Sequence, residues 1–376
     1  MQYRCAALSG KLCGGDVLPA RALRFPDGDR PGAKRRFCGQ ASLRLVGRWS
    51  CILAILTSSC NPTPSQAPDP LAVHLENAQN PLTIPTYDGS GQVTEPSVVF
   101  FDSPWHGFRY WMAFSPYPNG DASKENPSIV VSDDGKTWQA PPGLANPLAL
   151  PGQVGYLADA SIFYDCKSDR LWVYYLDTQP ATGNLGVKRL ISSDGIQWQS
   201  QGTLFEIPAY NAESPTVEKA AGGYYMWAVN SGTAGCSAAS TVVEYRLSTD
   251  GINWSAPQPA NLLQSGYEIW HLNVSYISSK QEYWALLAAY PAGSDCGHTV
   301  LFYSTSLDGM NWTSNSKIVL APGMTWDNAE IYRSTLLYDL DSNSLSVWYS
   351  ASSKLGEWHI GLAEVDYDQF LEWLSP

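Results

Sequence analysis

The chain has 376 residues, of which 44% are apolar and only 15% charged, so it can bury a sizeable core. Residues 1–60 carry ten Lys/Arg and three Asp/Glu, a net charge of +7, whereas residues 61–376 carry 13 Lys/Arg and 32 Asp/Glu, a net charge of −19. An acidic body repels phosphate backbones, which excludes nucleic acid as an expected partner, and the eight cysteines form no CxxC pair that would suggest structural zinc.

The basic leader, residues 1–60, has the features of an export signal. Arg44 and Arg48 precede a short apolar run that ends in Thr57-Ser-Ser-Cys60, and this run is too short to span a bilayer. Cys60 resembles a bacterial lipoprotein attachment site, and the Pro-rich residues 61–84 follow as an extended tether. We therefore expect a bacterial protein that is secreted or is a cell-surface or periplasmic lipoprotein, tethered to the membrane through a lipidated Cys60.

Residues 85–376 contain a repeat that indicates the fold. Four segments share the pattern Ser-x-Asp-Gly-x-x-Trp, and their tryptophans are separated by 60, 56 and 58 residues. Asp-Gly favours a tight turn because glycine adopts positive φ without a steric penalty, and the Trp can then cover the turn. These turns look like the Asp-boxes of sialidases, and we interpret their aspartates as structural. The four segments are residues 132–138, 192–198, 248–254 and 306–312.

Aromatic strands upstream of these turns raise the number of units from four to five. The fifth unit ends near Trp358 and lacks the Asp-Gly turn, as terminal repeats often do. Units of 55 to 64 residues with three or four strands each are typical of propeller blades arranged around a channel. We therefore predict an all-β, five-bladed β-propeller over residues 85–376. The five strands are centred on Trp111, Trp172, Trp227, Trp284 and Trp348.

The first strand of each propeller blade lines the axis, so residues at the heads of these strands should meet at one mouth of the channel. Three carboxylates from three blades would raise at least one pKa and create a proton donor, as glycoside hydrolysis requires. A histidine two residues before one of the heads lies on the same strand face. The predicted heads are Glu95, Asp159, Glu213, Asn273 and Arg333, and the histidine is His271.

These motifs resemble the five-bladed glycoside hydrolases, which include the family 43 arabinanases and xylosidases and the invertase and levansucrase group. Glu95-Pro-Ser is similar to their first-blade Asp-Pro-Ser, and Asp159-Ala-Ser and Glu213-Ser-Pro match the second and third blades. Residues 109–129 look like an uncharacterised bacterial subgroup of this superfamily. The resemblance implies Glu95 as general base, Glu213 as general acid and Asp159 as their orienter, with no required cofactor. It also implies His271 as the residue near a channel calcium.

Other residues complete the expected site. Trp105, Trp270 and Trp326 are expected in loops, where their rings could stack on sugars, and Asn273 and Arg333 are expected to contact substrate. Cys236 and Cys296 occupy comparable places in neighbouring units, so an exported chain could form a disulfide between them, whereas Cys166 has no evident partner.

The leading hypothesis is a monomeric glycosidase that cleaves a pentose- or fructose-type glycan. The alternative is a non-catalytic carbohydrate-binding propeller at the cell surface, which is suggested by Glu95 in place of the usual Asp. A sialidase is disfavoured because such enzymes need an arginine triad and the inner strands offer only Arg333.

Overall fold

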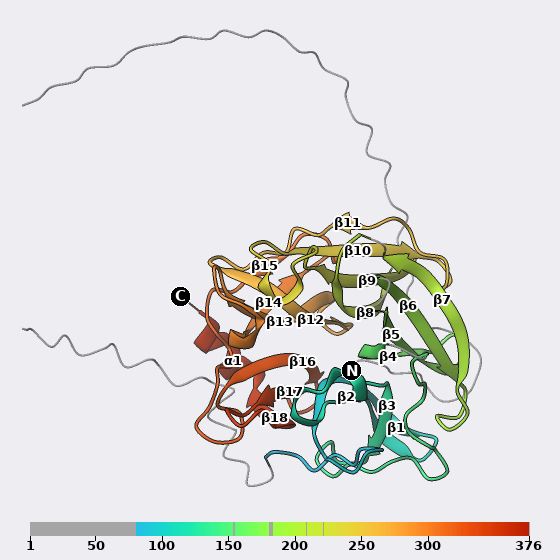
Figure 1. Ribbon diagram of the computed structural model, residues 1–376. Helices are drawn as coiled ribbons and strands as arrows, with labels where there is room; N and C mark the ends of the chain where they lie inside the picture. The colour runs from blue at the N-terminus through green and yellow to red at the C-terminus, as the bar shows by residue number, and fades with distance from the viewer. Residues whose placement is uncertain (1–79, 153–154, 180–182, 208, 221, 376) are drawn as a thin grey trace, which may run out of the picture. The chain divides into compact units, whose positions relative to one another are not determined.

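The computed structural model describes residues 80–375, apart from 153–154, 180–182, 208 and 221, so the leader and most of the expected tether lie outside the described residues. Five antiparallel sheets confirm the predicted five-bladed propeller (Figure 1). By blade, the strands are β1 (Val93–Trp105), β2 (Phe108–Pro116) and β3 (Ser128–Ser132); β4 (Tyr156–Asp165), β5 (Arg170–Gln179), β6 (Asn184–Ser192) and β7 (Gln199–Ile207); β8 (Ala212–Ala220), β9 (Gly223–Asn230), β10 (Val242–Ser248) and β11 (Gln258–Pro259); β12 (Tyr267–Ile277), β13 (Glu282–Pro291), β14 (Val300–Ser306) and β15 (Thr313–Ser314); β16 (Glu330–Asp339), β17 (Ser344–Ser352) and β18 (Trp358–Asp366).

The first strands of the blades form the inner ring. Contacts run from β1 to β4, β8, β12, β16 and back to β1, so the ring is closed. Residues 80–84 precede blade one but pack against blade five, where the Leu82 N–H donates a 2.8 Å hydrogen bond to the Ile360 carbonyl of β18. Leu82 and Ile84 are buried there. Segments from both ends of the described chain therefore build blade five.

The four Asp-Gly turns join neighbouring blades. Asp134 accepts hydrogen bonds from the backbone N–H groups of Lys136 (2.8 Å) and Thr137 (2.7 Å), and the same contacts recur in the other three turns. Each glycine has positive φ and lies against the central tryptophan of the preceding blade. At Gly195 an added Cβ would lie 2.1 Å from the Trp111 ring, so only glycine fits. The turns are structural, as the sequence indicated.

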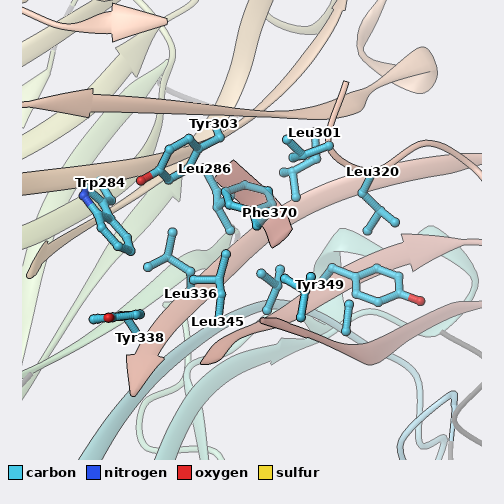
Figure 2. Close-up of a cluster of buried hydrophobic side chains, with 14 of the residues drawn as sticks. Trp284, Leu286, Leu301, Tyr303, Leu320, Leu336, Tyr338, Leu345, Tyr349 and Phe370 are labelled. Atoms are coloured by element: carbon cyan, nitrogen blue, oxygen red, sulfur yellow. The ribbon is translucent and has the colours of Figure 1, made fainter. Parts of the chain in front are cut away.

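Blade five lacks this turn, and a short helix takes its place. In the described residues α1 (Tyr367–Leu374) follows β18, and its Tyr367 ring stacks on Trp284 of blade four at 4.8 Å. Figure 2 shows Phe370 of the same helix among Leu301, Tyr303 and Leu336. The prediction of an all-β fold therefore missed α1. Its eight residues are too few to give a clear periodic pattern.

A disulfide confirms the predicted pairing of Cys236 with Cys296. Its cysteines lie in two short 3₁₀ turns, η3 (Gly235–Ser237) of blade three and η4 (Cys296–His298) of blade four. Among the described residues, no helix has the length and apolar character needed to cross a membrane.

Candidate active site

A repeated backbone irregularity positions the site. Near the start of β1, β4 and β8 the strand register shifts, and at each shift one non-glycine residue adopts the left-handed conformation. These residues are Glu95 (φ 60°), Asp159 (φ 58°) and Ser214 (φ 57°). Such a conformation costs about 1–3 kcal/mol for each residue and is typical of functional sites. Ser214, rather than the predicted Glu213, therefore occupies the position in blade three that is equivalent to the two acids.

Glu95 and Asp159 are hydrogen-bonded to each other across blades one and two. The backbone N–H of Asp159 donates to Glu95 Oε2 at 2.8 Å, and the Ser115 hydroxyl donates to the same oxygen at 3.0 Å. Both acids are almost fully buried. The two predicted carboxylates thus share one site because the left-handed turn at Asp159 aims its N–H at the neighbouring blade.

Arg333 of blade five reaches past blade one to blade two. Its Nη1 donates to Asp159 Oδ1 at 3.2 Å and to the Ala160 carbonyl at 3.4 Å, and its side chain is fully buried. Arg333 therefore links two blades that are not neighbours in the ring and pairs with Asp159. No contact with substrate is needed to explain its position.

His271 lies on the far side of Asp159. Its Nδ1 is 3.3 Å from Asp159 Oδ1 and 2.6 Å from the Ser214 hydroxyl oxygen. Its Nε2 is buried and has no hydrogen-bond partner among the described residues. Burial lowers the pKa of His271, so the imidazole is neutral at pH 7 and one ring nitrogen keeps a free lone pair.

The two central acids, Glu95 and Asp159, have pKa values shifted in opposite directions. Burial and the nearby charge of Asp159 raise the pKa of Glu95 to about 8. Burial alone would also raise the pKa of Asp159, but its contacts with His271 and the Arg333 guanidinium lower that pKa to about 2. Asp159 is therefore the fixed negative charge, whereas Glu95 holds a proton at neutral pH unless a further cation is present.

Two more carboxylates face this centre. Burial and the charges of Asp159 and Glu95 raise the pKa of Glu213 well above its ordinary value. Glu125, in the loop between β2 and β3, is also buried, and the charges of Glu95, Asp159 and Glu213 add to the effect of burial on its pKa. Glu125 was missed as a candidate because it lies in a loop and not at a strand head, although the segment containing it resembled the bacterial subgroup.

The cluster has the composition of a cation site. One ligand atom from each of Glu95, Asp159 and His271 lies within 4.8 Å of the others. Four carboxyl groups interact electrostatically here, those of Glu95, Asp159 and Glu125 buried and that of Glu213 half-buried, and among the described residues one guanidinium, that of Arg333, ion-pairs with Asp159. Burial raises the pKa values of Glu95, Glu125 and Glu213, the neighbouring negative charges raise them further, and a divalent cation would neutralise this excess of charge. Because imidazole is one of the donors, the set suits a transition-metal ion better than the calcium expected from the sequence.

The other predicted site residues lie outside the cluster of Glu95, Asp159 and His271. Asn273 is one step deeper along the axis, in a polar cavity with Ser97, Thr216 and Thr335, and it accepts a hydrogen bond from the Thr335 hydroxyl. Its prediction as a strand head was wrong by two residues, since His271 occupies the equivalent position in β12.

The three tryptophans that were predicted to lie in loops are found in different parts of the fold. Trp105 is the last residue of β1, at the other end of this strand from Glu95, and packs in the core against Trp111. Trp270 is within β12 and donates a hydrogen bond to the Tyr332 hydroxyl beside His271. The loop prediction was therefore wrong for both. Trp326 does lie in a loop, where its half-buried ring stacks on Tyr349.

The fold and its relatives define the class of protein. No protein-family model matches the chain. Its fold is shared with a thermostable family-43 glycoside hydrolase (TM-score 0.54, 13% identity, 72% of this chain and 88% of that one). It is also shared with an endo-arabinase from Bacteroides thetaiotaomicron (TM-score 0.53, 12% identity, 76% and 97%). The protein is a five-bladed β-propeller with the fold of these glycoside hydrolases.

A more similar protein is named for a different activity. An A type blood N-acetyl-α-D-galactosamine deacetylase from Flavonifractor plautii is 31% identical over 354 residues, which are 80% of this chain and 46% of that protein. The crystal structure of an N-acetylgalactosamine deacetylase from F. plautii with blood group B trisaccharide matches with a TM-score of 0.70 and 29% identity, over 76% of this chain and 92% of that one. The chain thus spans less than half the length of the curated relative.

Proposed function

We propose that this protein is a metal-dependent deacetylase that removes the acetyl group of an N-acetylated amino sugar, such as N-acetylgalactosamine, in a glycan. The observation that carries this proposal is the closeness of Glu95, Asp159 and His271, whose ligand atoms lie within 4.8 Å of one another. The N-acetylgalactosamine deacetylase that is 31% identical to this chain supports the same substrate class. This proposal replaces the pentose- or fructose-type substrate expected from the sequence.

The geometry favours cation binding over glycosidic cleavage by the same acids. One oxygen of Glu95 and one oxygen of Asp159 lie within 4.8 Å of each other and of a His271 nitrogen, which favours a shared cation, and Glu95 Oε2 already accepts two hydrogen bonds. Glu95, Asp159 and His271 would hold the cation, which when bound supplies a Lewis acid that polarises the amide carbonyl and lowers the pKa of water.

The reaction is hydrolysis of an amide, in which water adds to the acetyl carbon, the C–N bond breaks, and acetate and a free amine leave. Glu125 is the side chain we assign as general base, because it is a buried carboxyl group whose pKa is raised by burial and by the charges of Glu95 and Asp159, and it is not one of the three cation ligands. It would take a proton from the attacking water and return it to the amine. Tyr332 accepts a hydrogen bond from Trp270, so its own proton is available for the developing oxyanion.

A glycosidase remains the second candidate, because Glu213 is half-buried near Asp159 and Glu95 and its raised pKa suits a proton donor. The two reactions release different products from one substrate, so a single assay separates them. The purified protein is incubated with an oligosaccharide ending in N-acetylgalactosamine, with and without Mn²⁺, and acetate, free amine and released monosaccharide are measured.

Metal-dependent release of acetate with an intact sugar chain is the expected result. Release of monosaccharide without acetate would overturn the deacetylase and favour Glu213 as the acid. Glycan binding without either product would instead favour the non-catalytic surface propeller. Export through the predicted leader, which remains a proposal, would place any of these activities where external glycans occur.

A further inference from the structure

Ser214 lies at the site, although the sequence did not indicate it as a site residue and the proposed reaction gives it no role. It is fully buried, and its hydroxyl oxygen lies 2.6 Å from His271 Nδ1 and 3.3 Å from Asp159 Oδ1. One residue of blade three thus contacts both an acid from blade two and an imidazole from blade four.

The direction of these hydrogen bonds follows from the partners. An ionised Asp159 can only accept, so the Ser214 hydroxyl donates to Oδ1 and must then accept from His271 Nδ1–H. The opposite arrangement would place the Nδ1 lone pair 3.3 Å from a carboxylate oxygen, which is repulsive. The hydroxyl therefore selects the tautomer of His271 that carries its proton on Nδ1, leaving Nε2 as the nitrogen free to bind a cation.

The backbone makes this arrangement possible. Ser214 has φ 57°, a left-handed conformation that serine seldom adopts, and its hydroxyl donates a hydrogen bond to Asp159 from this turn. Glu95 and Asp159 adopt the same conformation at the equivalent positions of their blades. The backbone of blade three therefore has the same strained left-handed conformation as blades one and two, although its residue at this position carries no carboxylate.

We propose that Ser214 is a positioning residue for the metal ligands: its hydroxyl orients Asp159 and His271, and its loss weakens cation binding. This inference rests on the metal of the proposed function. Outer contacts of this kind change metal affinity about 10- to 100-fold when they are removed.

The test is isothermal titration of the metal-free protein with Mn²⁺. Ser214→Gly keeps the left-handed backbone but removes the hydroxyl, whereas Ser214→Ala removes the hydroxyl and adds backbone strain. Both variants should bind Mn²⁺ about 10- to 100-fold more weakly than the unmodified protein. Ser304→Ala is the matched control, because Ser304 is an equally buried serine of blade four whose hydroxyl contacts only Ser314 among the described residues.

Unchanged affinity in Ser214→Gly, or no Mn²⁺ binding by the unmodified protein, would overturn the inference. If both variants fail to fold, a crystal structure of the unmodified protein with Mn²⁺ decides the question, since Ser214 Oγ should remain hydrogen-bonded to the ring nitrogen of His271 that does not bind the metal. Serine-dependent Mn²⁺ binding without acetate release would refute the deacetylase and leave the role of Ser214 intact.

Discussion

The backbone N–H of Asp159 donates a 2.8 Å hydrogen bond to Glu95 Oε2, which links the acids of two neighbouring blades. This contact depends on the left-handed conformation of Asp159 and on the length of the Glu95 side chain. An aspartate at position 95 would be one methylene too short to make the same contact, so the glutamate is a specific feature of this pocket.

Shortening this side chain should therefore damage the site. In Glu95→Asp the carboxylate moves by about 1 Å, and a misplacement of this size costs on the order of 100-fold in kcat/KM. Acetate release and Mn²⁺ affinity are the two measurements, and both should fall. Glu372→Gln, which removes an exposed carboxylate from α1, is the control and should change neither.

Removing the assigned base should affect the chemical step alone. Glu125→Gln keeps the size of the side chain but cannot take a proton, so kcat should fall about 100- to 10,000-fold. KM and Mn²⁺ affinity should stay within about threefold, because Glu125 is not one of the three assigned ligands. An equal loss of Mn²⁺ affinity would show that Glu125 holds the cation and would contradict its role as base.

The Asp-Gly turns should matter for stability and not for activity. Asp250 accepts hydrogen bonds from the backbone N–H groups of Ile252 and Asn253, both at 2.8 Å, and these lower its pKa. Asp250→Ala should reduce the free energy of unfolding by about 1 kcal/mol. Thermal unfolding measures this change, and kcat/KM per folded molecule should be unaffected. A large loss of activity in the folded variant would mean that the turn takes part in the site.

The disulfide should stabilise the contact between blades three and four. Cys236 and Cys296 are separated by 60 residues, and closing a long loop typically contributes about 2–4 kcal/mol through the unfolded state. Cys236→Ser with Cys296→Ser should lower the unfolding temperature of the oxidised protein by an amount similar to that caused by a reductant. Cys166→Ser is the control for thiol loss alone, because Cys166 is outside the disulfide.

A carboxyl group outside the site should make stability depend on pH. Burial raises the pKa of Glu330 from 4.5 to about 7, and the Ser352 hydroxyl donates a hydrogen bond to its Oε1. Between these two pH values the folded state keeps a proton that the unfolded state has released. The contribution of Glu330 to the free energy of unfolding is therefore present below pH 4.5 and is lost as the pH rises to about 7.

Glu330→Gln should remove this dependence. Because Glu330 is only half-buried, the effect should be on the order of 1 kcal/mol, and the variant should be the more stable protein at pH 8. Urea unfolding at pH 5 and pH 8 measures the difference. The same slope in both proteins would show that another group is responsible.

The sequence by itself determined the number of blades, the turns between strands and the disulfide. These features follow from local chemistry that repeats along the chain: Asp-Gly turns, a central tryptophan in each unit, and cysteines at equivalent places. It also indicated Glu95, Asp159, His271 and Arg333 as neighbours, because radial symmetry brings equivalent strand positions together.

Only the tertiary structure decided which residue of blade three occupies the ring. Ser214-Pro-Thr216 aligns with Glu95-Pro-Ser97 and Asp159-Ala-Ser161 once the left-handed turns are seen, but the acid at position 213 obscured this in the sequence. Glu125 comes from a loop that carries no repeat signal, and α1 replaces a missing turn through Tyr367. The physical reasons differ: the ring position of Ser214 is set by a left-handed backbone turn that the residue types do not reveal, whereas Glu125 and Tyr367 belong to segments whose spacing is unrelated to the repeat, so that only folding brings them to their partners.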